Sequence, residues 1–241
     1  DQLLLNPSDN ELATVEIYAD FDFLYDLFEA ARQNLKRADS YPAKSYFALE
    51  TSTAGIPVEL LECYYNAEIG PSGINDLQLK NGRIGMSEES GTYYASLSTT
   101  QIISDYRLLN KRNNQFPTNP LQLNKNKLKR VYDLKLDAFQ DGIYKIRIIC
   151  KNEEWDYFNA TVWIDKFTEQ IVQIDLQEND LKKHPFVVID QEHKMDSLNF
   201  NISYTFSNDA TQSLDKIAFN YDLNYENNHH CLLYTSDAAD D

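Results

Sequence analysis

Histidines are the first residues in this sequence whose chemistry could support metal binding or catalysis. His184 and His193 stand alone, and His229 and His230 are adjacent. No pair has the i, i+4 spacing with an intervening Glu that zinc peptidases use. The four histidines are therefore interpreted as solvated loop residues, and no metal site is predicted.

Paired carboxylates are the second source of catalytic chemistry. Glu88-Glu89 and Glu153-Glu154 are examples, but adjacent acids in so acidic a chain are typical of exposed turns. Glycoside hydrolysis needs two carboxylates at a fixed gap across a cleft, and sequence does not define that gap. No Gly-x-Ser-x-Gly elbow and no phosphate-binding glycine loop occurs. We predict no catalytic and no cofactor-binding residue, and a hydrolase stays open only if two acids meet in one cleft.

Aromatic side chains are the remaining candidates for a binding site. Trp155, Tyr157 and Trp163 could stack on sugars or line a cavity of lipid size, because apolar concave sites commonly bind small ligands. Packing in a β-core or over a half-exposed sheet face is the alternative, and it is the favoured interpretation.

The charge of the chain limits its partners. The sequence contains 38 acidic and 22 basic residues, a formal net charge of −16. A negative surface repels phosphate backbones, so nucleic acid is not an expected partner. The basic run at residues 124–130 is interpreted as a solvated loop or strand edge. No run of about 18 apolar residues occurs, so no transmembrane helix is expected.

The most regular predicted element is an amphipathic helix, assigned to residues 21–40. Its apolar positions step by three and four residues, the period of one helical stripe. They are Phe21, Leu24, Phe28, Ala31 and Leu35. Such a stripe needs covering, so we expect the helix to pack on the domain that follows.

Residues 41–230 have the pattern of an antiparallel β-rich domain. Turns are expected at residues 54–57, at Asn81-Gly82 and at Asp141-Gly142, and at least five consecutive strands lie between residues 130 and 225. One predicted strand places Phe158, Ala160, Val162 and Ile164 on one face and Trp163 on the other. In the next, Ile171, Gln173 and Asp175 face one side, while Val172, Ile174 and Leu176 face the other. Cys63 and Cys150 lie in strand-like runs and are expected to be buried free thiols, although a disulfide between them stays open.

Both ends of the chain have features that suggest a fragment. Residues 1–20 contain two extended runs around a turn, which we interpret as the terminal strands of a truncated β-sandwich. All eleven residues of "CLLYTSDAADD", 231–241, match an in-frame translation of a transposase adapter used in sequencing libraries. We therefore expect residues 231–241 to be a non-native tail, and residues 41–230 to be a domain truncated at its C-terminus. Without the three aspartates of that tail, the net charge is −13.

The order of segments resembles a group of Bacteroidota cell-envelope proteins. In these, a carboxypeptidase-regulatory-like sandwich, which is not catalytic, precedes a domain of unknown function. The stretches that carry the resemblance are "LLLNPSDNELATVEIYAD", "LYDLFEAARQNL", "YYNAEIG", "LQLKNGR", "GIYKIRIIC" and "ATVWIDKFTEQIVQIDLQ". The last is similar to the sheets of lipoprotein-carrier-like half-barrels. Asp196-Ser197-Leu198 also resembles the O-glycosylation signal of periplasmic proteins in that phylum.

Together, residues and resemblance predict an α+β, mainly β fold: a twisted, half-barrel-like antiparallel sheet packed by one N-terminal amphipathic helix. The predicted function is a non-enzymatic scaffold or binding domain of an exported protein, in the periplasm or at the outer membrane. Its expected partners are other envelope proteins or a hydrophobic ligand. The alternative is a periplasmic carrier of a lipid or other hydrophobic ligand in a half-barrel cavity. No cofactor is expected.

Overall fold

The computed structural model describes residues 21–53, 55–87, 106–109, 116–180, 194–209, 211–226 and 231–237. The expectations for residues 1–20, for the four histidines and for Glu88-Glu89 fall outside these ranges.

Strands dominate the described part of the chain. The helical elements are α1 (Phe21–Arg37), the 3-10 turn η1 (Pro120–Gln122) and α3 (Lys125–Val131). The strands are β1 (Tyr41–Thr53), β2 (Ile56–Gly70), β3 (Gly73–Met86), β4 (Tyr132–Gln140), β5 (Ile143–Cys150), β6 (Asn159–Asp165), β7 (Ile171–Glu178), β8 (Lys194–Phe206), β9 (Leu214–Glu226) and β10 (Cys231–Asp237). The prediction of a mainly β, antiparallel protein is confirmed.

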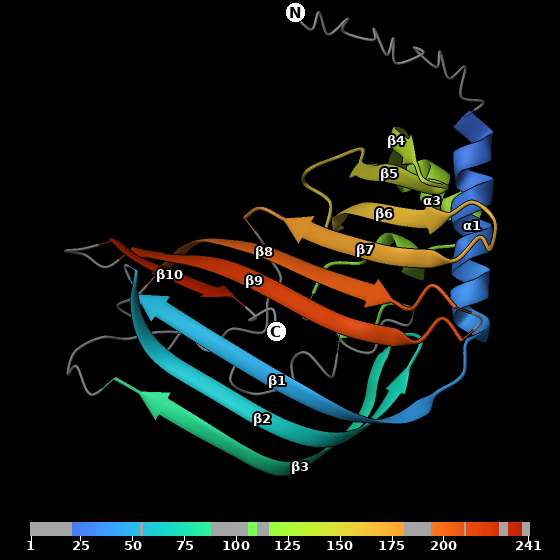
Figure 1. The fold of residues 1–241 in the computed structure, drawn as a ribbon. Helices are drawn as coiled ribbons and strands as arrows, with labels where there is room; N and C mark the ends of the chain where they lie inside the picture. The colour runs from blue at the N-terminus through green and yellow to red at the C-terminus, as the bar shows by residue number, and fades with distance from the viewer. Residues whose placement is uncertain are drawn as a thin grey trace, which may run out of the picture.

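All the strands belong to one curved sheet in the order β3-β2-β1-β10-β9-β8-β7-β6-β5-β4 (Figure 1). Sequence neighbours pair antiparallel within two groups, β1 to β3 and β4 to β9, which we call the small leaf and the large leaf. Strand β10 joins the two leaves. It pairs with β9 over residues 220–226, but with β1 only over residues 50–53.

The joining strand lies in the segment that the sequence analysis assigns to a translated adapter. Its pairing with both neighbours is antiparallel, so β1 and β9 run parallel to each other on either side of it. The adapter origin of the segment stays a prediction.

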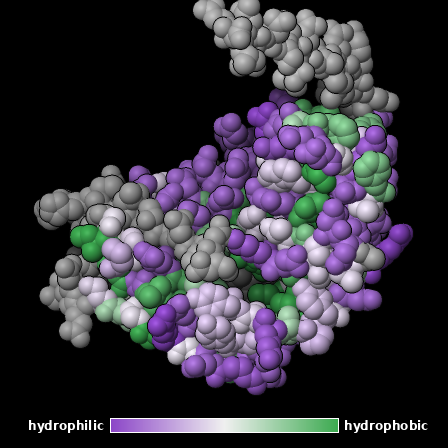
Figure 2. Space-filling view, viewed as in Figure 1, coloured by the Kyte–Doolittle hydropathy of each residue, from purple (hydrophilic) through white to green (hydrophobic). Residues whose placement is uncertain are grey.

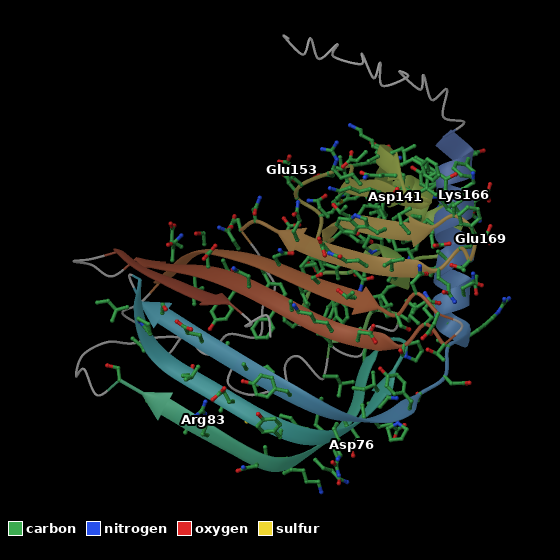
Figure 3. The ribbon with its side chains drawn as sticks, viewed as in Figure 1. Asp76, Arg83, Asp141, Glu153, Lys166 and Glu169 are labelled. Carbon is green, nitrogen blue, oxygen red and sulfur yellow. The ribbon has the colours of Figure 1, made fainter. Side chains whose placement is uncertain are left out.

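Helix α1 occupies the predicted position and lies beside the large leaf in Figure 1. The side chains of Leu24, Phe28 and Leu35 are at most 1% exposed and belong to the same core as the inner faces of both leaves. The Tyr25 hydroxyl donates to the carbonyl oxygen of Tyr132, at 2.8 Å. Near the other end of the helix, Asn34 donates to the carbonyls of the β6–β7 turn, close to the labelled Glu169 in Figure 3.

Several local predictions in the large leaf are confirmed. Asp141 and Gly142 form the tight turn between β4 and β5, with φ of 52° and 81°, the left-handed values that a type I′ hairpin requires. The predicted inner face of β6 is buried throughout, from Phe158 to Ile164. The neighbouring strand differs, because a register shift opposite Trp163 and Ile164 lets Ile171 join Ile174 in the core. A β-bulge of this kind breaks the two-residue alternation on which the prediction depended.

Asn81-Gly82 does not form the predicted turn. Both residues continue β3, next to a register shift at Tyr64 and Tyr65 of β2. A Cβ at position 82 would lie 2.9 Å from the Cys63 sulfur, so glycine here permits a close approach of two strands. Cys63 and Cys150 are both buried and free, as expected.

The basic run at residues 124–130 is also not a loop or strand edge. It forms α3, capped by Asn124, whose side chain accepts from the Lys127 amide at 3.0 Å. Leu128 and Val131 are buried, while Lys125 and Lys129 are half-buried and pair with acids of α1. Seven residues are too few for a periodic signal, so sequence alone did not distinguish this helix from a loop.

Candidate functional site

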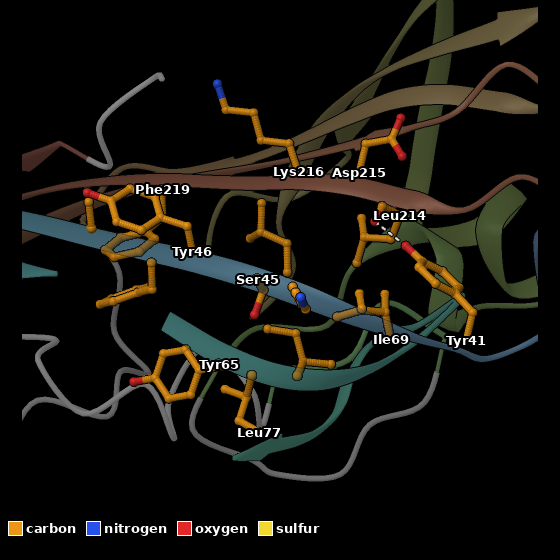
Figure 4. A pocket seen from close by; sticks show the side chains of 16 residues that line it. Tyr41, Ser45, Tyr46, Tyr65, Ile69, Leu77, Leu214, Asp215, Lys216 and Phe219 are labelled. Atoms are coloured by element: carbon orange, nitrogen blue, oxygen red, sulfur yellow. Dashed lines mark hydrogen bonds between the residues drawn. The ribbon is translucent and has the colours of Figure 1, made fainter. Parts of the chain in front are cut away.

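A cleft of about 450 Å³ opens between β1 of the small leaf and β9 of the large leaf (Figure 4). It continues the line of β10. The pairing with β10 ends at Glu50 of β1 and at Asn220 of β9. Beyond these residues, no described strand lies between residues 41–49 of β1 and residues 214–219 of β9. Parts of β2 and β3 complete its wall.

The cleft lies beside the backbone of β1 and not over one face of the sheet. Six consecutive residues of β1, from Ala43 to Ala48, line it, as do Leu214, Asp215, Lys216 and Ile217 of β9. Consecutive side chains of a strand point to opposite faces, so a cavity that touches all of them must run along the strand edge. The arrangement is a gap in the plane of the sheet.

A hydrogen bond closes the far end of this gap. The Tyr41 hydroxyl donates to the Leu214 carbonyl oxygen at 2.6 Å, so a side chain spans the distance between the two strands (Figure 4). Burial, followed by the charge of Asp215, raises the pKa of Tyr41 above its ordinary value. The phenol therefore stays protonated and able to donate at neutral pH.

The inner side of the cleft is apolar. The rings of Phe47 and Phe219 stack across it with centroids 6.3 Å apart and an interplanar angle of 18°. Ile69, Ile74 and Leu77 line the wall contributed by the small leaf. In Figure 2, hydrophobic residues lie among hydrophilic ones over the lower half of the molecule, where this leaf lies. The inner side therefore suits apolar groups of a ligand.

The outer side of the cleft carries polar and cationic groups. Lys44 and Lys216 are exposed on either side of the gap. Next to them, the Tyr46 hydroxyl donates to Glu62 at 2.5 Å, and this hydrogen bond raises the pKa of Tyr46 to about 12. Arg83 pairs with the same carboxylate and holds the pKa of Glu62 below its ordinary value. Glu62 is therefore already paired, and the charged residues that line the gap are Lys44, Lys216 and Asp215.

The three aromatic residues that the sequence analysis singled out do not line this cleft. Trp155 is 44% exposed in the loop between β5 and β6, next to Tyr157, which packs edge-on against Tyr132. Trp163 lies on the outer face of β6 with the Lys145 ammonium 5.2 Å from its ring. The first two are brought together, and Trp163 stands apart from them.

The carboxylates of the described residues form no catalytic pair that we recognise. Glu178, at the end of β7, has the most distinctive environment: burial, and then the charges of Asp156, Asp180 and Glu153, raise its pKa to about 7. Figure 3 shows Glu153 in the β5–β6 loop, away from the small leaf. In the described part of the chain, no group of three His, Cys, Asp or Glu side chains is arranged to hold a metal. No described helix is long and apolar enough to cross a membrane.

Sequence reasoning missed Tyr41, Phe47 and Phe219. Each occupies an inward position of an alternating strand, where Tyr and Phe are common core residues. Only the divergence of β1 from β9 makes them cleft residues, and no local pattern reports that divergence.

Comparisons with known proteins assign no family. No family model matches the sequence, and no curated protein matches it. Among solved structures, the MucA/MucB complex of Pseudomonas aeruginosa is 7% identical with a TM-score of 0.27, covering 89% of this chain and 92% of that one. A LolA superfamily protein from Nitrosomonas europaea is 11% identical with a TM-score of 0.27, at 89% and 90% coverage. An outer membrane lipoprotein-sorting protein domain from Vibrio parahaemolyticus is 13% identical with a TM-score of 0.27, at 88% and 89% coverage. Scores of this size carry no argument, so the class of this protein follows from its own architecture: an open, curved antiparallel sheet with one flanking helix and a cleft between two strands.

Proposed function

We propose that this chain is a non-enzymatic binding domain of an exported cell-envelope protein, and that its ligand occupies the cleft between β1 and β9. One observation carries the proposal: a cavity of about 450 Å³ lies between residues 43–48 of β1 and 214–219 of β9, and its lining combines apolar and polar side chains. Cavities of this size with apolar walls and a few polar groups are common ligand sites.

The cellular context of the proposal comes from the sequence. The segment order resembles Bacteroidota envelope proteins, and Asp196-Ser197-Leu198 resembles a periplasmic glycosylation signal. Association with the outer membrane is part of the same proposal.

Site-specific photo-crosslinking tests whether the cleft is used. A photoreactive phenylalanine replaces Ser45, which lines the cleft, and the purified protein is irradiated in a Bacteroidota envelope extract. We expect one dominant adduct at position 45, identified as protein or lipid by mass spectrometry. The matched control carries the same group at Asn66, which is exposed on β2 and does not line the cleft. Equal labelling at both positions would contradict the proposal. So would turnover of a peptide, ester or glycan substrate that is lost when one acidic residue is replaced.

The second candidate function is carriage of a lipid or other hydrophobic ligand. The stacked Phe47 and Phe219 and the aliphatic wall of the small leaf favour it, because they offer an apolar surface that water solvates poorly. A dansyl-labelled fatty acid should then bind saturably, and Ser45→Trp should abolish binding by filling the cleft. Asn66→Trp is the control for the effect of an added indole.

A further inference from the structure

Among the described side chains, three phenylalanine rings are exposed at the end of the large leaf that carries the β4–β5 and β6–β7 turns. The side chain of Phe167, in the second turn, is 82% exposed, while those of Phe23 and Phe139 are each 46% exposed. Phe139 packs on Tyr144 with ring centroids 4.5 Å apart, and Phe23 meets the same Tyr144 ring edge-on at 5.8 Å. The Lys166 ammonium lies 5.4 Å from the centroid of the Phe139 ring and 5.9 Å from that of Phe167. These five connected residues are called the aromatic ridge.

The folded turn itself holds Phe167 in this exposed position. The Asp165 carboxylate accepts hydrogen bonds from the amides of Phe167 and Thr168, at 2.8 and 2.9 Å. Asn34 of α1 donates to the Thr168 carbonyl oxygen at 3.3 Å. A backbone hydrogen bond of 2.8 Å joins the same turn to the carbonyl oxygen of Gly142 in the β4–β5 turn. The exposure of the ring is therefore built into the structure of the turn and is not a result of fraying.

A connected apolar surface in solvent marks a place where a protein meets a membrane or another molecule. Two features of the ridge favour a membrane. The ring of Phe167 projects from a turn, so a protein partner would need a pocket of matching shape, whereas the fluid headgroup region of a bilayer accepts a projecting ring without one. Aromatic rings and lysines also suit that region, because the rings take the apolar side while the ammonium reaches the phosphate groups.

The charges around the ridge indicate which lipids suit it. Asp141 and Glu169 are exposed in the two turns that also carry Lys166 (Figure 3). Asp22, near the start of α1, is paired with Lys129. Two acids beside one lysine, on a chain with a net charge of −16, give anionic lipids no advantage. Transfer of the rings out of water must therefore supply the binding free energy, and a zwitterionic headgroup offers Lys166 its phosphate.

From these observations we propose that the aromatic ridge inserts into the headgroup region of a lipid membrane, with Phe167 as its deepest residue and zwitterionic phospholipid as its preferred surface. The ridge shares no residue with the cleft between β1 and β9, so this inference goes beyond the proposed function and does not rest on it. The end of the large leaf with the two turns then faces the membrane.

Flotation with phosphatidylcholine vesicles measures the binding of the full chain. We expect saturable binding that Phe167→Ser weakens about tenfold to hundredfold, the scale of removing one phenylalanine ring from an apolar environment. Leu79→Ser is the matched control, because Leu79 is 61% exposed on β3 and does not belong to the ridge. Its replacement should leave binding unchanged. Absence of binding, or equal binding by both variants, overturns the inference and leaves the proposed cleft ligand standing.

An indole at position 167 tests insertion directly. Phe167→Trp is combined with Trp155→Phe and Trp163→Phe, so that the new indole is the only one in the chain. Acrylamide should quench its fluorescence in the free protein, and brominated phosphatidylcholine should quench it in the bound state. Shielding from acrylamide without lipid would mean that this chain itself covers the ridge, and bound protein that brominated lipid leaves unquenched would bind through another surface. Either result overturns the inference, as does binding that phosphatidylglycerol strengthens and that Phe167→Ser retains.

Discussion

At the scale of single residues, Glu178 has a raised pKa that makes the stability of the protein depend on pH near neutrality. Its folded pKa is about 7, raised first by burial from the value of 4.5 that applies to the unfolded chain. Between these two values the folded state binds more protons than the unfolded state. Stability therefore falls as pH rises through this window. Carboxylates with lowered pKa, such as Asp165, act in the opposite direction, but only at lower pH.

Glu178→Gln should remove most of this dependence. We expect the denaturation midpoint of the unmodified protein to fall between about pH 5 and about pH 8, and that of the variant to fall less, because no buried carboxylate has to ionise. Thermal denaturation at both pH values measures the difference. Glu68→Gln, at an exposed position of β2, is the control and should behave like the unmodified protein. Equal pH dependence in all three proteins would show that Glu178 is not responsible.

At the scale of elements, α1 shows how one stripe holds a helix to a sheet. Phe28 is fully buried in the shared core, whereas Phe23, five residues earlier, is 46% exposed and packs edge-on against the Tyr144 ring. The two phenylalanines therefore provide a matched pair within one helix.

Phe28→Ala should lower the free energy of unfolding by about 3–5 kcal/mol, since it removes a buried ring and leaves a cavity. Phe23→Ala should cost about 1 kcal/mol, the scale of one edge-on ring contact. Urea denaturation of both variants gives the comparison. Similar losses would mean that the helix is not anchored by its inner stripe.

The same elements show what sequence could and could not predict. The helix and the Asp141-Gly142 turn follow from local patterns, the three-to-four spacing and a dipeptide that accepts positive φ. Asn81-Gly82 carries the same kind of signal, but long-range pairing with β2 keeps it inside β3. The cleft was not predictable, because it depends on where β1 stops pairing with a strand almost two hundred residues later, Glu50 with Asp237. The residue type of Trp155 suggested a binding role, whereas Tyr41 belongs to the cleft only because of its position in the fold.

At the scale of the whole molecule, the connection between the leaves is narrow. Only the four residue pairs between β1 and β10 join the small leaf to the large leaf through described sheet pairing. The core shared by Leu49, Ile69 and Leu198 also connects the leaves, as does the hydrogen bond from the Tyr41 hydroxyl to the Leu214 carbonyl.

Removing residues 231–241 should therefore loosen the small leaf and expose one edge of β9, and leave the rest of the large leaf intact. Hydrogen exchange of the amides in β1 should speed up, because their pairing with β10 is lost, while amides of β5 and β6 should keep their protection. Removing only residues 238–241 is the control, since it retains β10. Unchanged exchange in β1 after the larger deletion would show that side-chain packing alone holds the leaves together.

The pairing of β1 with β10 also determines the order in which the protein can be assembled during synthesis. The hairpins of the small leaf form from contacts close in sequence, so they can fold soon after they leave the ribosome. The edge of β1 must then wait for its partner β10, because the paired residues are almost two hundred positions apart, as Glu50 and Asp237 are. A strand edge left open for so long is where other chains pair and aggregation begins, so slow synthesis should increase the need for chaperones.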